Sequence, residues 1–259
     1  MAQVFQALLL VHIVVGFFGL VAFWFPVLSG KGGRFHMRTG RAFLYAGYVV
    51  GGTAVVLAIL TAATPFTVHP DERPALAETT PEVLADMRSF AVFLAYLGVI
   101  TVATVHHGVR AMQTRRRPAA IRTPLHTVLN ATAVVSSLVV GVTGVVTAAP
   151  PLLALTPLGV LVGGSALRYA RRDPASPMAY WYEHMGAMIG GGIAFHTAFA
   201  VFGIRRFVAY DTDGLAGIAP WILPGVVGTI ASLLWQRRYR QRFGERKDQM
   251  PLPVPPVAG

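Results

Sequence analysis

Histidines carry most of the chemistry that this sequence offers, and seven of the eight lie in or beside long apolar runs. Ionisable side chains are costly in lipid, so each one within a span marks a candidate functional site. Two of the seven, His12 and His196, are expected deep in the membrane, each below the same surface. The other five are expected near the opposite surface: His36, His106, His107, His126 and His184.

Two imidazoles on facing helices are the usual axial ligands of a b-type haem. The sequence favours a redox protein that binds haem b through inward-facing histidines and exchanges electrons with quinone. Small residues beside a ligand leave space for a flat macrocycle, and Gly16 and Gly19 follow His12 while Gly192 precedes His196. The candidate cofactor ligands are His12, His107, His126, His184 and His196.

The spacing of two of these candidates argues against a simple stack of two haems. His184 and His196 are twelve residues apart, which is about 18 Å along a helix and about 120° around it. Two ligands for haems stacked in one groove are expected on one face of the helix. The spacing therefore favours different partners for these two histidines.

A divalent metal such as zinc is the alternative cofactor, bound by His106, His126, His184 and Glu183. The chain would then be a metal-dependent membrane enzyme or a metal carrier. No H-x-x-x-H or H-E-x-x-H spacing supports this reading, and adjacent histidines point about 100° apart on a helix. The ordinary structural explanation for these residues is that the histidines lie at the membrane interface. The charge of Glu183 is then stabilised by the dipole of its own helix.

The sequence lacks the residues that several classes of chemistry require. The chain has no cysteine, which excludes disulfides, thiolate metal sites and thiol catalysis. No glycine-rich phosphate loop or nucleophile motif stands out, so no catalytic residue is assigned. A small-molecule transporter or an accessory membrane protein without a cofactor is the third possible function. The net charge of +11 does not indicate nucleic-acid binding, because no soluble basic domain carries it.

The apolar runs must position these side chains. Each run is close to 20 residues long, which is the length that a helix needs to cross a bilayer. Hydrophobic residues make up 54% of the chain and charged residues only 13%, against about 25% charged in soluble domains. Continuous rather than alternating apolar runs exclude a barrel. The sequence predicts an all-α bundle with spans near 4–28, 42–64, 89–110, 125–148, 152–168, 179–203 and 217–236.

The basic residues predict the orientation of this bundle. Four segments near 29–41, 108–124, 166–178 and 237–259 hold 18 of the 22 Lys and Arg residues. The positive-inside rule places them in the cytoplasm. Only an odd number of spans puts all four on one side, so the N-terminus is expected outside. Trp24, Trp181 and Trp235 are then expected near the inner interface.

Local signals predict how the helices begin, turn and pack. The sequence AAPP at 148–151 predicts a tight hairpin between the fourth and fifth spans, and Thr80-Pro81-Glu82 predicts the start of the third. Glycine pairs at four-residue spacing predict close helix packing: Gly47/Gly51, Gly159/Gly163 and Gly186/Gly190. Residues 1–240 are expected to form the transmembrane domain, and 241–259 a polar, Pro-rich cytoplasmic tail.

Two segments resemble a bacterial family of uncharacterised predicted membrane proteins. His12 and Gly16, followed by FHMRTGRAFLYAGYVV at 35–50, resemble that family's opening, and WYEHMGAMIGGGIAFHTAFAVF at 181–202 resembles its later helix. His196 and Met37 depart from the family pattern. The resemblance implies a bacterial cytoplasmic membrane as the location and brings no settled activity. The matching positions are His12, His36, Gly40, Arg41, Glu183, His184 and Met185.

Overall fold

The structure, a computed structural model, describes residues 1–259 except 76–79, 116, 173–175, 205–206, 208–213 and 246–259. All regular structure in the described residues is helical. Seven of the helices in this part are long and apolar enough to cross a membrane. The predicted all-α bundle is therefore confirmed, and the fold is that of a multi-pass integral membrane protein.

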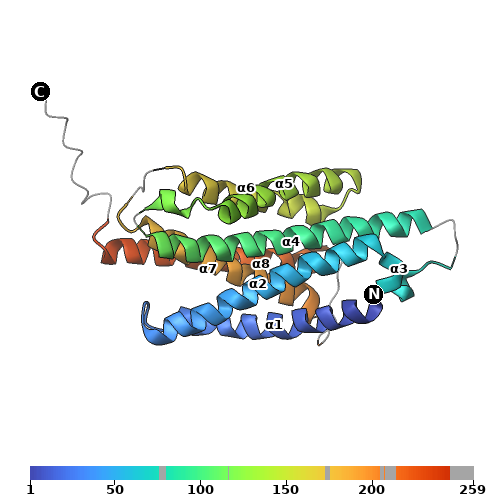
Figure 1. The fold of residues 1–259 in the computed structure, drawn as a ribbon, viewed down its shortest axis with the longest axis horizontal. Coiled ribbons are helices and arrows are strands. Elements are labelled where there is room, and N and C mark those ends of the chain that lie inside the picture. The colour runs from blue at the N-terminus through green and yellow to red at the C-terminus, as the bar shows by residue number, and fades with distance from the viewer. Residues whose placement is uncertain (76–79, 116, 173–175, 205–206, 208–213, 246–259) are drawn as a thin grey trace, which may run out of the picture.

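The long helices lie side by side along one common direction (Figure 1). They are α1 (Ala2–Leu28), α2 (Arg34–Ala63), α4 (Thr80–Thr114), α5 (Pro124–Val146), α6 (Pro150–Tyr169), α7 (Ala179–Ala198) and α8 (Gly214–Arg242). The short elements are α3 (Pro65–Val68), η1 (Pro70–Glu72), η3 (Pro118–Ile121) and the π-helical turn η4 (Phe199–Gly203), which extends α7. Helix α4 begins at Thr80, as the sequence predicts.

Helix α4 forms the centre of the bundle, because it contacts α2, α5, α6 and α7. One core cluster lies between α4 and the α5–α6 hairpin, with Phe93 and Tyr96 almost fully buried in it. A second lies where α1, α2, α4 and α7 meet, around Phe43 and Val105. Helix α8 contacts α7, and none of its described residues is buried.

Two of the three predicted glycine pairs are sites of close helix packing. A β-carbon at Gly51 on α2 would lie 2.8 Å from the carbonyl oxygen of Gly98 on α4. At Gly159 and Gly163 on α6, a β-carbon would collide with main-chain oxygens of α5. These glycines therefore let the helix backbones approach closely.

The third pair has another role. Nothing lies within 4 Å of a β-carbon built at Gly186, and the nearest atom at Gly190 is a methyl carbon of Thr104 at 3.3 Å. Both glycines instead line a cavity on α7. The prediction of close packing is wrong for Gly186, because α6 does not pack against this face of α7.

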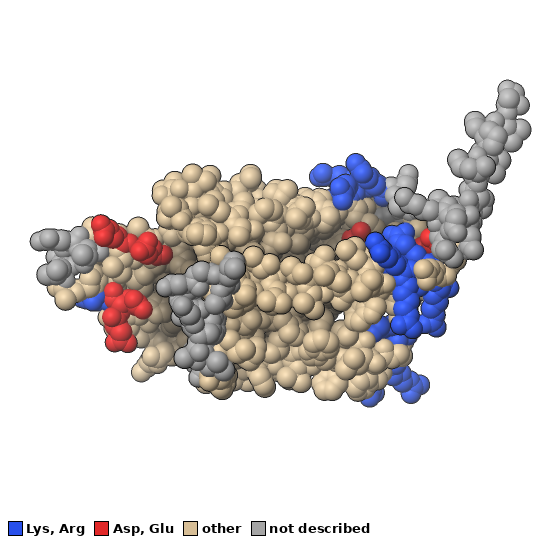
Figure 2. Space-filling model, turned by 180° about the vertical axis from the view of Figure 1, so that it is seen from behind, with Lys and Arg blue, Asp and Glu red and all other residues tan. Residues whose placement is uncertain are grey.

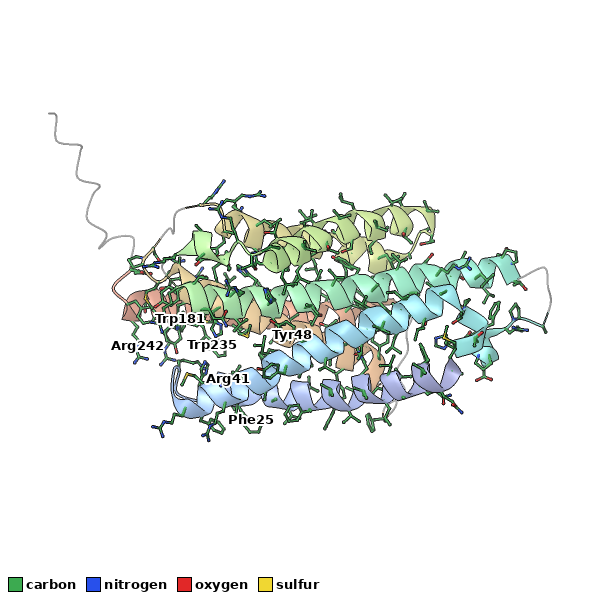
Figure 3. All side chains as sticks on the ribbon, in the orientation of Figure 1. Phe25, Arg41, Tyr48, Trp181, Trp235 and Arg242 are labelled. Carbon is green, nitrogen blue, oxygen red and sulfur yellow. The ribbon has the colours of Figure 1, made fainter. Side chains whose placement is uncertain are left out.

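Charges of opposite sign gather at opposite ends of the bundle (Figure 2). We call one of them the basic end, where Trp181, Trp235, Arg41 and Arg242 lie (Figure 3). Trp181 there packs against the ring of Tyr239, with ring centroids 4.2 Å apart. An aromatic belt with basic side chains is typical of the cytoplasmic interface of a membrane protein.

The start of the predicted tail continues the folded domain. Helix α8 extends to Arg242. Glu245 accepts hydrogen bonds from the hydroxyl of Tyr182 at 3.0 Å and from the amide of Met178 at 3.2 Å. The Pro-rich remainder of the tail, 246–259, lies outside the described residues.

Candidate functional site: a polar cavity at the basic end

Three helices bring two histidines and a glutamate into one hydrogen-bonded chain. Nε2 of His107 on α4 lies 3.0 Å from Oε2 of Glu183 on α7. Nδ1 of His107 lies 3.1 Å from Nε2 of His126 on α5. Glu183 must accept if it is ionised, so Nε2 of His107 donates to it and Nδ1 of His107 accepts from His126. The three groups form an aligned chain of donors and acceptors along which a proton can pass.

Exposure increases along this hydrogen-bonded chain from His126 to Glu183. His126 is fully buried, the side chain of His107 is 7% exposed, and that of Glu183 is 35% exposed. Glu183 therefore joins an accessible space to two imidazoles inside the bundle. Ionisable groups buried in a membrane bundle usually mark a functional pathway.

Two side chains, those of Thr123 and Asn130, bond the main chain of His126. Thr123 caps the helix, and its hydroxyl accepts a hydrogen bond from the amide of His126 at 3.2 Å. The side-chain amide of Asn130 donates to the carbonyl of His126 at 2.8 Å. Asn130 thus bonds the backbone of His126 and not its ring. Nδ1 of His126 and Oδ1 of Asn130 have no described partner although both are buried.

His106 faces a different part of the bundle from its neighbour. Its Nδ1 lies 2.9 Å from the hydroxyl of Tyr48 on α2. The rings of His106 and His126 are 6.2 Å apart between centroids, without a hydrogen bond. The divergence of His106 and His107 follows from their adjacent positions on one helix.

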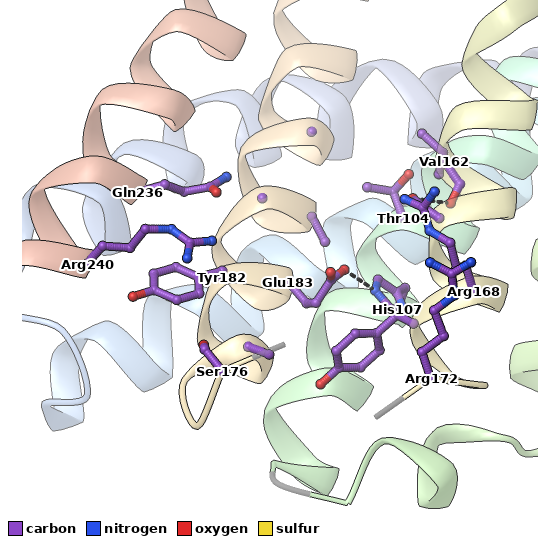
Figure 4. Close-up of a pocket in the computed structure, with 16 residues that line it drawn as sticks. Thr104, His107, Val162, Arg168, Arg172, Ser176, Tyr182, Glu183, Gln236 and Arg240 are labelled. Atoms are coloured by element: carbon purple, nitrogen blue, oxygen red, sulfur yellow. Dashed lines mark hydrogen bonds and ion pairs between the residues drawn. The ribbon is translucent and has the colours of Figure 1, made fainter. Parts of the chain in front are cut away.

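A cavity of about 550 Å³ opens beside this chain at the basic end (Figure 4). It lies between α6 on one side and α7 and α8 on the other, with α4 contributing His107 and Thr104. Its size is in the range of pockets that bind small molecules. Its lining includes Val162, Ala187 and Gly190 as well as Ser176 and three arginines, of which Arg168 and Arg172 lie on one side and Arg240 on the other (Figure 4). The cavity therefore has both an apolar and a polar surface.

Three cations line the cavity beside one acid. Arg168 and Arg172 come from the end of α6 and the turn after it, and Arg240 comes from α8. Among the described residues of the lining, Glu183 is the only acid. The guanidinium carbon of Arg240 lies 4.5 Å from the ring centroid of Tyr182, whose hydroxyl is bonded to Glu245. This stacking positions the cation. The excess of positive charge favours an anionic ligand.

Two polar groups of the lining also need a partner. The hydroxyl of Tyr169 and Oγ of Ser176 are buried, and no described residue bonds either of them. Buried polar groups are normally satisfied by protein, water or a ligand. Tyr169 packs edge-on against His107, with ring centroids 5.7 Å apart. A ligand or water in the cavity can bond these hydroxyls next to the histidine chain.

His184 and His36 lie outside the hydrogen-bonded chain above, and each is bonded to a main-chain carbonyl. Nδ1 of His184 donates to the carbonyl of Gly108 at 2.9 Å, and Nδ1 of His36 donates to that of Pro26 at 3.1 Å. The Nε2 atom of each forms no hydrogen bond to another described residue. An imidazole oriented by a carbonyl in this way is typical of metal ligands.

His12 and His196 do not form the expected layer. Nδ1 of His12 lies 2.9 Å from the hydroxyl of Thr53. The indole of Trp24 donates to Nε2 of His196 at 3.2 Å, and Nδ1 of His196 donates to the carbonyl of Gly192 at 2.7 Å. Trp24 is twelve residues after His12 on α1, about 18 Å along the helix. One haem cannot be bound by both histidines.

Two of the three glycines beside these histidines, Gly19 and Gly192, are covered by aromatic rings, whereas a β-carbon at Gly16 would meet only a methyl carbon of Val50 at 3.9 Å. A β-carbon at Gly19 would collide with the ring of Phe195, and one at Gly192 would collide with the ring of Phe23. Phe23 also lies edge-on to His196, at 5.5 Å between centroids. Aromatic side chains therefore fill the volume in which the sequence suggested a cofactor.

The residues proposed as metal ligands are not gathered around one point. His106 bonds Tyr48, and His184 bonds the carbonyl of Gly108. Glu183 bonds His107, which was not in that set. Within the described residues, no group of three or more His, Asp or Glu side chains is arranged to hold a metal ion.

Sequence reasoning missed the partners that define the cavity. It treated Arg168, Arg172 and Arg240 only as topology signals, and it did not pair Glu183 with His107. The available signal was that a span-embedded carboxylate needs a partner across a helix interface. Comparison of the chain with family models, curated proteins and solved structures gives no match. The resemblance to an uncharacterised family therefore stays a prediction, and the chemistry of the site has to support any function.

Proposed function

We propose that this chain binds the head group of an anionic amphiphile from the cytoplasmic leaflet and exchanges a proton with it. The observation that carries the proposal is the meeting of three arginines with the Glu183–His107–His126 chain in one cavity. A phosphate or carboxylate head can pair with the arginines. The apolar tail can lie against Val162, Ala187 and Gly190.

The position of Glu183 supports the proton exchange. It lines the cavity and is bonded to His107, which is bonded in turn to His126. A proton leaving an acidic head group can be accepted by Glu183 while the imidazoles readjust their hydrogen bonds. With the basic end in the cytoplasm, as the positive-inside rule predicts, the cavity opens at the inner leaflet.

The test is a binding measurement on the full chain in nanodiscs, with phosphatidic acid as the anionic probe and phosphatidylcholine of the same acyl chains as the neutral one. We expect phosphatidic acid to bind at least about tenfold more tightly, which is ~1.4 kcal/mol. R168Q and R240Q should remove the preference. R237Q and R238Q are matched controls, because these exposed arginines of α8 do not line the cavity.

The proton exchange has a separate readout. Binding of phosphatidic acid to the unmodified chain should depend on pH beyond the titration of the lipid itself, and E183Q should abolish that extra dependence. Equal binding of the two lipids, or equal losses in R240Q and R238Q, would disprove the anion site. An unchanged pH profile in E183Q would disprove the proton exchange.

A second function, electron transfer through haem b, is favoured by one observation. His36 and His184 are oriented by carbonyl groups and leave their Nε2 atoms free of described partners. These two imidazoles would be the axial ligands, in place of the wider set suggested by the sequence. Haem would supply the one-electron chemistry, with quinone as the expected exchange partner.

An absorption spectrum tests this second function. Protein purified from haem-replete cells should show a Soret band that shifts on reduction with dithionite. H184A and H36A should lose the band, and H69A should keep it because His69 lies near the end of the bundle opposite the basic end. A colourless preparation, or a band unaffected by H184A and H36A, would exclude the assignment. Added quinol should reduce the haem if quinone is the partner.

A further inference from the structure

A second basic cavity lies next to the one described above. Its volume is about 530 Å³, and it is formed by η3, the residues around it and the turn after α6. The described residues of its lining are arginines and alanines: Arg117, Ala119, Ala120, Arg122, Ala170, Arg171 and Arg172. The described residues of this lining include four arginines and no acid, so they favour an anionic ligand.

Packing holds the walls of this second cavity. Ile121 of η3 is fully buried against Ala111 of α4 and Ala170 at the end of α6. The guanidinium of Arg110 donates to the carbonyl of Ala120 at 3.1 Å. The turn that carries Arg117 and Arg122 is therefore fixed to both α4 and α6.

Arg172 lines both cavities. Arg168 and Tyr169 face the first cavity, and Ala170 and Arg171 face the second. The end of α6 thus lies between two anion sites, with one arginine common to them. A guanidinium has five N–H donors in a planar fork and can bond two neighbouring oxyanions at once.

We propose that the two cavities form one site for a ligand with two phosphate groups, one in each cavity and both in contact with Arg172. The inference rests on the proposed function, since the first phosphate occupies the cavity assigned there to an anionic head. One phosphate in the first cavity leaves the arginines of the second unneutralised. A second phosphate on the same molecule neutralises them without a second binding event.

Two sources supply this chemistry. One is a lipid with two phosphates in its head group, such as cardiolipin, and basic pockets between transmembrane helices on the cytoplasmic side bind such head groups. The other is a soluble compound with two phosphates, for which inorganic pyrophosphate is the probe. The apolar wall at Val162 and Ala187 favours the lipid.

The experiment measures binding of cardiolipin and of phosphatidylglycerol with the same acyl chains to the full chain in nanodiscs. We expect cardiolipin to bind at least about tenfold more tightly. R122Q combined with R171Q should lower cardiolipin binding to the level of phosphatidylglycerol and leave phosphatidylglycerol binding unchanged. R237Q combined with R238Q is the control with the same loss of charge.

The outcomes separate this inference from the proposed function. Equal binding of the two lipids, or a loss in R122Q/R171Q no larger than in R237Q/R238Q, overturns the two-phosphate site while the first cavity can still bind one anion. Failure of R168Q and R240Q to weaken phosphatidylglycerol overturns the proposed function itself. Displacement of cardiolipin by pyrophosphate supports the site and assigns it to a soluble diphosphate. A cardiolipin preference that pyrophosphate does not affect assigns it to the lipid.

Discussion

The hydroxyl of Tyr96 on α4 is inserted into the backbone hydrogen bonds of α6 at Gly159. It accepts a hydrogen bond from the amide of Gly159 at 2.8 Å and donates to the carbonyl of Leu155 at 2.7 Å. These two groups would otherwise bond to each other as an i to i−4 pair. Pro157 lies between them and removes one further backbone donor. One fully buried hydroxyl thus joins the central helix to a proline-containing helix that lines the cavity.

Replacing Tyr96 by phenylalanine should destabilise the protein by about 1–3 kcal/mol, because two buried backbone groups lose their partner. The measurement is unfolding in detergent by circular dichroism. Tyr45→Phe is the control, since Tyr45 is 63% exposed. An equal, small effect of both changes would show that α6 closes its own hydrogen bond without the tyrosine.

Adjacent glycines on α6 provide a sharp test of helix packing. A β-carbon at Gly163 collides with the carbonyl of Asn130, whereas Gly164 has nothing within 4 Å of its β-carbon. Gly163→Ala should therefore cost about 1–3 kcal/mol, whereas Gly164→Ala should be neutral or stabilising by up to about 1 kcal/mol. The same unfolding assay compares them, and similar stabilities would contradict the close α5–α6 contact.

Filling the cavity should block ligand binding without unfolding the protein. Gly186 lines the cavity, and its β-carbon position is open, so a leucine there can occupy the space and also favours the helix. Gly186→Leu should weaken phosphatidic acid binding at least about tenfold, or ~1.4 kcal/mol. Gly164→Leu, open but outside the cavity, should bind normally. Normal binding by Gly186→Leu would place the ligand elsewhere.

The absence of cysteine makes the topology directly testable by labelling single cysteines. Asp71→Cys and Gln241→Cys place a thiol at exposed positions of η1 and α8, near opposite ends of the bundle. In intact cells a membrane-impermeant maleimide should label position 71, and position 241 only after permeabilisation. This follows from the positive-inside rule. The reverse pattern would invert the bundle and place the cavity at the outer leaflet.

The sequence predicted the number and type of elements well, because lipid leaves few solutions for long apolar runs. The predicted spans were shorter than the helices at their polar ends. The second span was expected to begin at residue 42, but α2 begins at Arg34. Hydropathy detects only the part of a helix within the apolar layer. Helix α2 continues beyond that part through polar residues.

The site was less predictable because it depends on which helix faces pack together. The sequence identified His107, His126, His184 and Glu183 as candidates, since an ionisable group in a span is unusual whatever it contacts. It did not pair Glu183 with His107, which lie 76 positions apart on α7 and α4. It also placed His12 and His196 at a common depth by counting from helix ends, whereas His196 contacts Trp24.

Composition and charge by themselves determined that the chain forms a helical membrane bundle, and they predicted which end is basic. Each of these depends on the solvation of one segment at a time, which a sequence records directly. Only the tertiary structure decided that α6 is separated from α7 by a cavity, that Gly186 lines this cavity, and that Arg172 lines two cavities. Those facts depend on the rotation and tilt of whole helices, which are set by many small packing contacts between segments distant in the sequence.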